Sequence, residues 1–190
     1  LAEYWMAEGK LSKVTKIIEG TWESAPHPSL VEPFWAACKA ADALDRVKAT
    51  EKLTKRNPGH LESHIAMAMS SLRAQLWGEA RKHLENAIEA SRASAPSPGA
   101  ALGLPARICR MMAELEESEN GDSGLAREWL MRVSEANQDP AWVCDHCGNT
   151  VGEWSVVCGK CEDFDSFDWR TPASILGLPE GGGLAESDPG

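Results

Sequence analysis

The chain has 190 residues, 43% hydrophobic and 25% charged, which is the composition of an ordinary globular protein rather than of a membrane or disordered chain. Its formal net charge of -10 argues against a nucleic-acid binder, because such proteins usually present a basic face. The sequence contains neither a run of ~20 apolar residues that could span a bilayer nor a signal peptide at its start.

The first residues already follow a helical pattern, and the chain begins with Leu1 rather than Met. We therefore expect a fragment of a longer protein. Any membrane anchor of that protein would then precede Leu1.

Residues 1–93 and 106–138 predict helices in pairs. The clearest helix starts at Trp77, and its apolar positions lie on one face at helical spacing: Trp77, Ala80, Leu84, Ala87 and Ile88. These offsets fit the second helix of a tetratricopeptide repeat. The first helix of that pair would carry four apolar residues: Ile65, Met67, Ala68 and Leu72.

Three further copies of the helix pair fit less closely. The expected second helices carry these residues: Gly9, Leu11, Val14 and Ile18; Leu44, Val47 and Leu53; and Ala126, Leu130 and Val133. Val14 and Ala80 are 66 positions apart, two periods of 33, close to the ~34 residues of this repeat class. A Pro- and Gly-rich insertion at 94–105 interrupts the pattern, because proline ends helices. Asn120-Gly121 predicts a helix end, and Asp122 or Ser123 predicts the next start.

The sequence therefore predicts a mainly α fold, with a tetratricopeptide-like array over residues 1–138. Stacked helix pairs share a continuous core and expose a curved surface that usually binds another protein. We expect the first helix of the best pair, around 63–73, to contact a protein partner. Its candidate contact residues are His64, Ser71 and Arg73.

After Pro140 the pattern becomes short, turn-rich and aromatic, which predicts short strands in a small module at 139–172. We expect Trp142, Trp154 and Trp169 to pack in its interior. The remaining residues, 173–190, are rich in glycine, and we expect a disordered tail there.

Two Cys-x-x-Cys pairs predict a metal site in this module, with four ligands: Cys144, Cys147, Cys158 and Cys161. Each pair places two thiolates on a tight turn, so two pairs can surround one ion. All four positions would be filled by protein, which favours structural zinc. Iron also suits four thiolates and would permit electron transfer, and two disulfides are the remaining alternative.

The module is also acidic: residues 140–172 carry four more acidic than basic residues, which argues against nucleic acid as its partner. Elsewhere, His60 and His64 have the i, i+4 spacing of a metal or haem site, but no third ligand is evident, and we expect ordinary helix positions. Cys38 and Cys109 are expected to be buried. Five acidic residues are expected to form a solvated face: Glu114, Glu116, Glu117, Glu119 and Asp122.

Segments 139–148 (DPAWVCDHCG) and 164–172 (FDSFDWRTP), with Trp154-Ser155 between them, resemble the C-terminal end of the alphaproteobacterial HemY-like proteins. The resemblance covers 1–172. It implies an inner-membrane protein with its repeats on the cytoplasmic side and a link to haem biosynthesis. It does not imply protoporphyrinogen oxidation, since the chain has no dinucleotide-binding glycine motif.

The architecture is similar to that of the LapB regulators of lipopolysaccharide synthesis, which combine helical repeats with a rubredoxin-like metal site. In such sites a glycine often follows the last cysteine, whereas this chain has Glu162. Together these features predict a non-enzymatic scaffold that binds a protein partner at the inner membrane and holds structural zinc. The alternative is an iron-containing redox or haem-handling protein.

Overall fold

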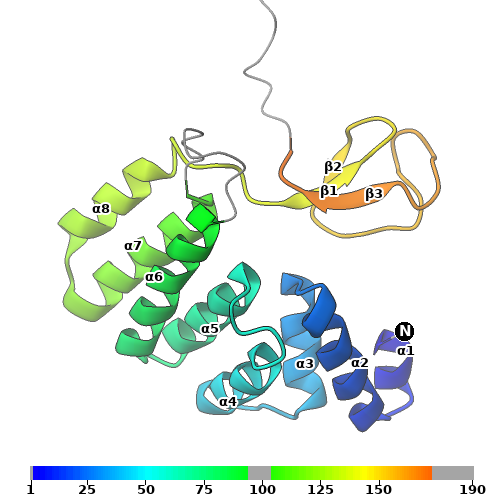
Figure 1. Cartoon of the computed structure of the whole chain (residues 1–190), viewed down its shortest axis with the longest axis horizontal. Coiled ribbons are helices and arrows are strands. Elements are labelled where there is room, and N and C mark those ends of the chain that lie inside the picture. Colours follow the sequence, from blue (N-terminus) through cyan, green and yellow to red (C-terminus); the bar gives the residue numbers. More distant parts are fainter. Residues whose placement is uncertain (1, 94–103, 173–190) are drawn as a thin grey trace, which may run out of the picture. The chain divides into compact units, whose positions relative to one another are not determined.

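The chain forms two compact units, the first ending at Asn137 and the second beginning at Gln138 (Figure 1). The computed structural model describes residues 2–93 and 104–172. Most of the expected insertion, 94–103, and the expected disordered tail, 173–190, lie outside the described residues.

The first unit is a succession of helix pairs (Figure 1). The pairs are α1 (Ala2–Ala7) with α2 (Leu11–Ser24), α3 (Val31–Ala37) with α4 (Ala43–Thr54), α5 (Leu61–Arg73) with α6 (Trp77–Ala93), and α7 (Ala106–Asn120) with α8 (Ser123–Arg132). A short 3-10 helix, η1 (Pro28–Leu30), precedes α3. The mainly helical, paired architecture that the sequence predicts is confirmed.

Local chemistry explains where several helices begin and end. Asp42 and Asp122 cap α4 and α8, because their carboxylates accept backbone N–H groups of the first turn. Gly121 ends α7 in the left-handed conformation with φ 65°, which glycine adopts without strain. The end predicted at Asn120-Gly121 and the start predicted at Asp122-Ser123 are both confirmed.

The core of this unit consists of two hydrophobic clusters that meet at α5. The first cluster joins α2, α3 and α4 and contains fully buried Trp22, Phe34 and Leu53. The second joins α5, α6 and α7 and contains Leu84 and Ile108. Helix α5 contributes to both, since Ala66 and Met69 pack in the first cluster, whereas its Ile65, Ala68 and Leu72 belong to the second. The array is therefore continuous across its pairs, as stacked repeats require.

A buried hydrogen bond joins the second and fifth helices. The indole Nε1 of Trp22 donates to Oγ of Ser63 over 2.9 Å, and Oγ of Ser63 donates to the carbonyl of Asn57 over 2.6 Å. Because the indole N–H of Trp22 and the hydroxyl of Ser63 each have an acceptor, the burial of Trp22 leaves no unpaired donor at this contact.

The expectation that Glu116 belongs to a solvated acidic face is wrong. This side chain is buried, and its carboxylate receives two hydrogen bonds from Arg81 on α6, the shorter at 2.6 Å. Arg81 also reaches Glu119 over 2.6 Å. The hydrogen bonds from Arg81 lower the pKa of Glu116, so the carboxylate stays ionised and ties α7 to α6.

The last helix also differs from the expectation. Ala126 is buried as predicted, but Leu130 is 54% exposed and Val133 lies just beyond the end of α8. Helix periodicity identifies an apolar face, but that face is buried only where a neighbour covers it. No later helix of the described chain packs on α8 in this unit.

The second unit contains a three-stranded antiparallel sheet in the order β2-β1-β3. Its strands are β1 (Ala141–Cys144), β2 (Thr150–Val151) and β3 (Phe167–Arg170). Trp142 lies opposite Trp169, and the two rings meet edge to face with centroids 5.3 Å apart. The expectation for Trp154 is wrong, because its side chain is 50% exposed. The expected small β module is confirmed.

Among the helices of residues 2–93 and 104–172, none combines the length and the apolar character that crossing a bilayer requires.

Candidate metal centre

Two turns with the same hydrogen-bond pattern carry the four cysteines. In the first, the N–H of Gly148 donates to the carbonyl of Cys144, and the N–H of Cys144 donates to the carbonyl of Asn149, at 2.9 and 2.8 Å. In the second, the N–H of Glu162 donates to the carbonyl of Cys158 at 2.8 Å, and the N–H of Cys158 donates to the carbonyl of Asp163 at 2.9 Å. The module therefore consists of two equivalent knuckles, each presenting one Cys-x-x-Cys pair.

The residue after each second cysteine adopts a left-handed backbone, with φ 69° at Gly148 and φ 62° at Glu162. Glycine adopts this conformation freely, whereas a residue with a Cβ pays roughly 1–2 kcal/mol. The second knuckle thus keeps the usual turn despite its unusual residue, and it carries the strain of Glu162.

Glu162→Gly is expected to stabilise the metal-loaded module by about 0.5–1 kcal/mol. Relief of the left-handed strain is partly offset by the greater freedom of glycine in the unfolded chain. Thermal unfolding followed by tryptophan fluorescence measures this change. The matched control is Gly148→Ala, which should destabilise the module, because Gly148 has a left-handed backbone that alanine disfavours. An added Cβ at Gly148 meets no atom within 4 Å, so this control tests the backbone conformation alone. A lower stability of Glu162→Gly would contradict the assignment of strain.

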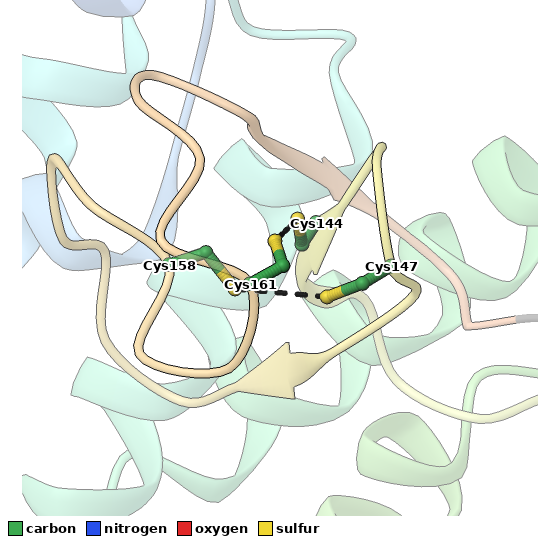
Figure 2. Close-up of side chains that lie close together, drawn as sticks. All are labelled: Cys144, Cys147, Cys158 and Cys161. Carbon is green, nitrogen blue, oxygen red and sulfur yellow. Dashed lines mark hydrogen bonds between the residues drawn. The ribbon is translucent and has the colours of Figure 1, made fainter.

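The four sulfur atoms lie within 4.8 Å of one another and point toward a common centre (Figure 2). The Sγ atoms of Cys144 and Cys161 are 3.7 Å apart, as are those of Cys147 and Cys158. A tetrahedral ion with metal–sulfur bonds of ~2.3 Å requires sulfur–sulfur distances of about 3.8 Å. The group therefore has the dimensions of a four-thiolate metal site. All four cysteines are free, so the structure does not contain the disulfides of the alternative interpretation.

Hydrogen bonds prepare two of the sulfurs to bind as thiolates. At Cys144 the Ser166 hydroxyl, 3.2 Å from the sulfur, and backbone N–H groups lower the pKa. At Cys158 the backbone N–H groups of Cys161 and Lys160 lower the pKa to about 6. Metal ligands must be deprotonated, so these donors favour metal binding near neutral pH.

Ser166 and Asn149 are site residues that sequence reasoning missed. Ser166 contacts the Cys144 sulfur, and the amide of Asn149 donates to the Cys158 sulfur over 3.7 Å. Ser166 is 22 positions from Cys144, and neither residue belongs to a spacing motif. Such outer donors tune a metal through tertiary contacts rather than through a sequence pattern.

The other candidate ligands do not join this site. His60 caps α5 by accepting the N–H of Glu62, whereas His64 contacts His83 on α6. Cys109 is buried as expected, while Cys38 is half-buried. The alternative of a joint site formed by His60 and His64 is therefore not observed, because His64 contacts His83 on the neighbouring helix instead.

The three candidate partner-binding residues lie on different sides of α5. Ser71 is fully buried, so its proposed role at an exposed surface is wrong. Arg73 is exposed, stacks on Trp35 with 5.4 Å to the ring centroid and lies 3.8 Å from Glu32. His64 and Ser71 are seven positions apart and share one face, roughly opposite Arg73.

No family model matches the chain. A comparison with curated proteins found a relative that is 32% identical over 168 residues, or 86% of this chain. It is the probable magnetosome protein Mms48 of Magnetospirillum gryphiswaldense. The chain matches 34% of the length of Mms48, about a third of that protein. The description of Mms48 mentions neither haem nor lipopolysaccharide, so this comparison gives no support to the predicted link with haem biosynthesis.

Proposed function

We propose that this chain is a non-enzymatic interaction module, in which the helical array binds a segment of a protein partner and the four cysteines hold a structural zinc ion. The observation that carries the proposal is an apolar pocket of about 410 Å³ on the first helices of successive pairs. It lies between η1, α3 and α5.

The pocket is lined mainly by apolar side chains. They are Pro28, Val31, Pro33, Ile65, Ala66 and Met69. On α5 the lining residues, together with exposed Arg73, recur at helical spacing and so form one face of the helix. A concave apolar pocket with a few polar groups is the usual form of a binding site.

Two carboxylates at the pocket differ in their environment. Glu62 is buried and neutralised by Arg107, which donates two hydrogen bonds to it. Glu32 is 74% exposed, and its contact with Arg73 is long at 3.8 Å. Glu32 is therefore available to a cation, and the net charge of -10 attracts basic segments. We infer a partner segment with an apolar side chain for the pocket and a neighbouring Lys or Arg for Glu32.

The role proposed for zinc is structural. The protein supplies four thiolates, which complete a tetrahedron and leave no position for a substrate or an activated water. The same ligands suit iron, and the alternative function is electron transfer at an iron centre. A structural role is favoured because the module has a very small core of its own, so a metal ion is required mainly for folding.

The complete protein is proposed to act at a membrane. Two observations support this location: the resemblance of the sequence to inner-membrane HemY-like proteins, and the similarity to a protein described as a magnetosome protein. The side of the membrane proposed for the repeats is the cytoplasmic one.

The peptide-binding proposal is tested by fluorescence anisotropy with peptides selected from an array by the metal-loaded chain. Peptides with an apolar residue beside Lys or Arg should bind, and added salt should lower their affinity by screening the charge interaction. Met69→Glu and Glu32→Lys should each weaken binding at least tenfold, about 1.4 kcal/mol.

Glu85→Lys is the matched control, because it makes the same charge change at an exposed position on α6 that does not line the pocket. It should leave binding nearly unchanged. Equal affinities for the control and both pocket variants, with normal circular dichroism, would contradict the assignment of the pocket.

A further inference from the structure

The imidazoles of His64 on α5 and His83 on α6 face each other. Their Nδ1 atoms are 3.3 Å apart, and the ring centroids are 5.6 Å apart. We propose that these nitrogens form an open site for a divalent first-row transition metal ion, separate from the four cysteines and independent of peptide binding. Imidazole nitrogens suit zinc, copper, nickel and cobalt.

The distance between the two nitrogens matches that of a bound metal. With metal–nitrogen bonds of ~2.1 Å, two ligands of a tetrahedral ion are about 3.4 Å apart. The observed 3.3 Å is close to this requirement. Without a metal ion, one Nδ1–H donates a hydrogen bond to the other Nδ1, so metal binding requires the donating ring to hold its proton on Nε2 instead.

A carboxylate lies near the second ring nitrogen of His83 and favours one tautomer electrostatically. Oε2 of Glu79, one helical turn earlier on α6, lies 3.8 Å from Nε2 of His83. A proton held on Nε2 toward this carboxylate leaves Nδ1 with a free lone pair for the metal. This arrangement, in which a carboxylate supports a histidine ligand through its other nitrogen, is usual in metal sites.

Space for the remaining ligands lies beside the pair. His64 and His83 form part of the lining of a pocket of about 110 Å³, together with Thr54, Ser63 and Met67. This volume holds water ligands, each of which occupies ~30 Å³. The site is therefore open, unlike the site formed by four cysteines.

The charges around the pair do not oppose a cation. Two lysines lie nearby, and both are paired: Lys55 with Glu51 at 2.9 Å and Lys82 with Glu79 at 3.6 Å. Burial lowers the pKa of both His64 and His83, which keeps the rings neutral at neutral pH. Neutral imidazole is the form that binds metals.

The test is a cobalt titration of the full chain after the four cysteines have been saturated with zinc. Equilibrium dialysis should show one additional Co²⁺ per chain. The bound ion should give ligand-field absorption without the intense sulfur-to-cobalt charge-transfer band that binding to the cysteines would produce. Absence of an additional ion, or a charge-transfer band alone, would overturn the proposal.

Variants identify the ligands. His64→Gln and His83→Gln should each weaken cobalt binding at least tenfold, and Glu79→Gln should weaken it about tenfold through the lost support. The matched control is His60→Asn, which retains a capping side chain on the same helix and should bind cobalt normally. Unchanged binding in both His64→Gln and His83→Gln would overturn the site even if either variant were less stable. Circular dichroism verifies that each variant is folded.

Discussion

Replacing Cys147 with Ser is expected to release the metal ion and unfold the module at 139–172, while the helices of the first unit remain folded. Four thiolates bind structural zinc with an apparent free energy of about 10–16 kcal/mol, and in so small a module this energy is also folding energy. The buried hydrophobic residues of the described part of the module are few: Val143, Cys144, Cys158 and Phe167.

Elemental analysis and tryptophan fluorescence measure this outcome. The unchanged protein should contain about one zinc per chain. A red chain with stoichiometric iron would instead favour the electron-transfer alternative. Cys38→Ser is the matched control, because Cys38 is a free cysteine outside the site and its replacement should leave the metal content unchanged.

Helical circular dichroism should survive the loss of the metal. The first unit has two hydrophobic clusters of its own, and both consist of its helical residues. Stacked repeats are stabilised mainly by their neighbours. A full equivalent of metal in Cys147→Ser would contradict the ligand assignment, whereas loss of the helical signal would contradict the independence of the two units.

Trp22→Ala is expected to lower the free energy of unfolding of the helical unit by about 3–5 kcal/mol, the usual cost of removing a large buried aromatic side chain. Trp22 is fully buried in the first cluster, and its indole binds Ser63 on α5. The substitution therefore removes both packing within α2–α4 and a link to the next helix pair.

Urea denaturation of the metal-loaded chain, followed by circular dichroism, measures the loss. Trp154→Ala is the matched control, because it removes the same side chain at a position that is 50% exposed in the other unit. It should change the helical transition by less than about 0.5 kcal/mol. Similar midpoints for Trp22→Ala and the unchanged chain would show that the first cluster does not stabilise the array.

The sequence alone determined the features that depend on local spacing. The paired helices followed from apolar residues at helical period, the end of α7 from Asn120-Gly121, and the group of four cysteines from two Cys-x-x-Cys pairs. Each of these signals lies within a few residues, where backbone geometry fixes which side chains come together. Sequence reasoning therefore predicted the fold class and the group of four cysteines correctly.

Only the tertiary structure decided the contacts between distant residues. It paired His64 with His83 rather than His60, joined Arg81 to buried Glu116, and turned Ser71 into the core. Helical periodicity shows that a residue lies on a face, but the neighbouring helix determines whether that face is buried, paired or open. The partner of each side chain is then fixed by the packing of whole elements, which no short sequence motif encodes.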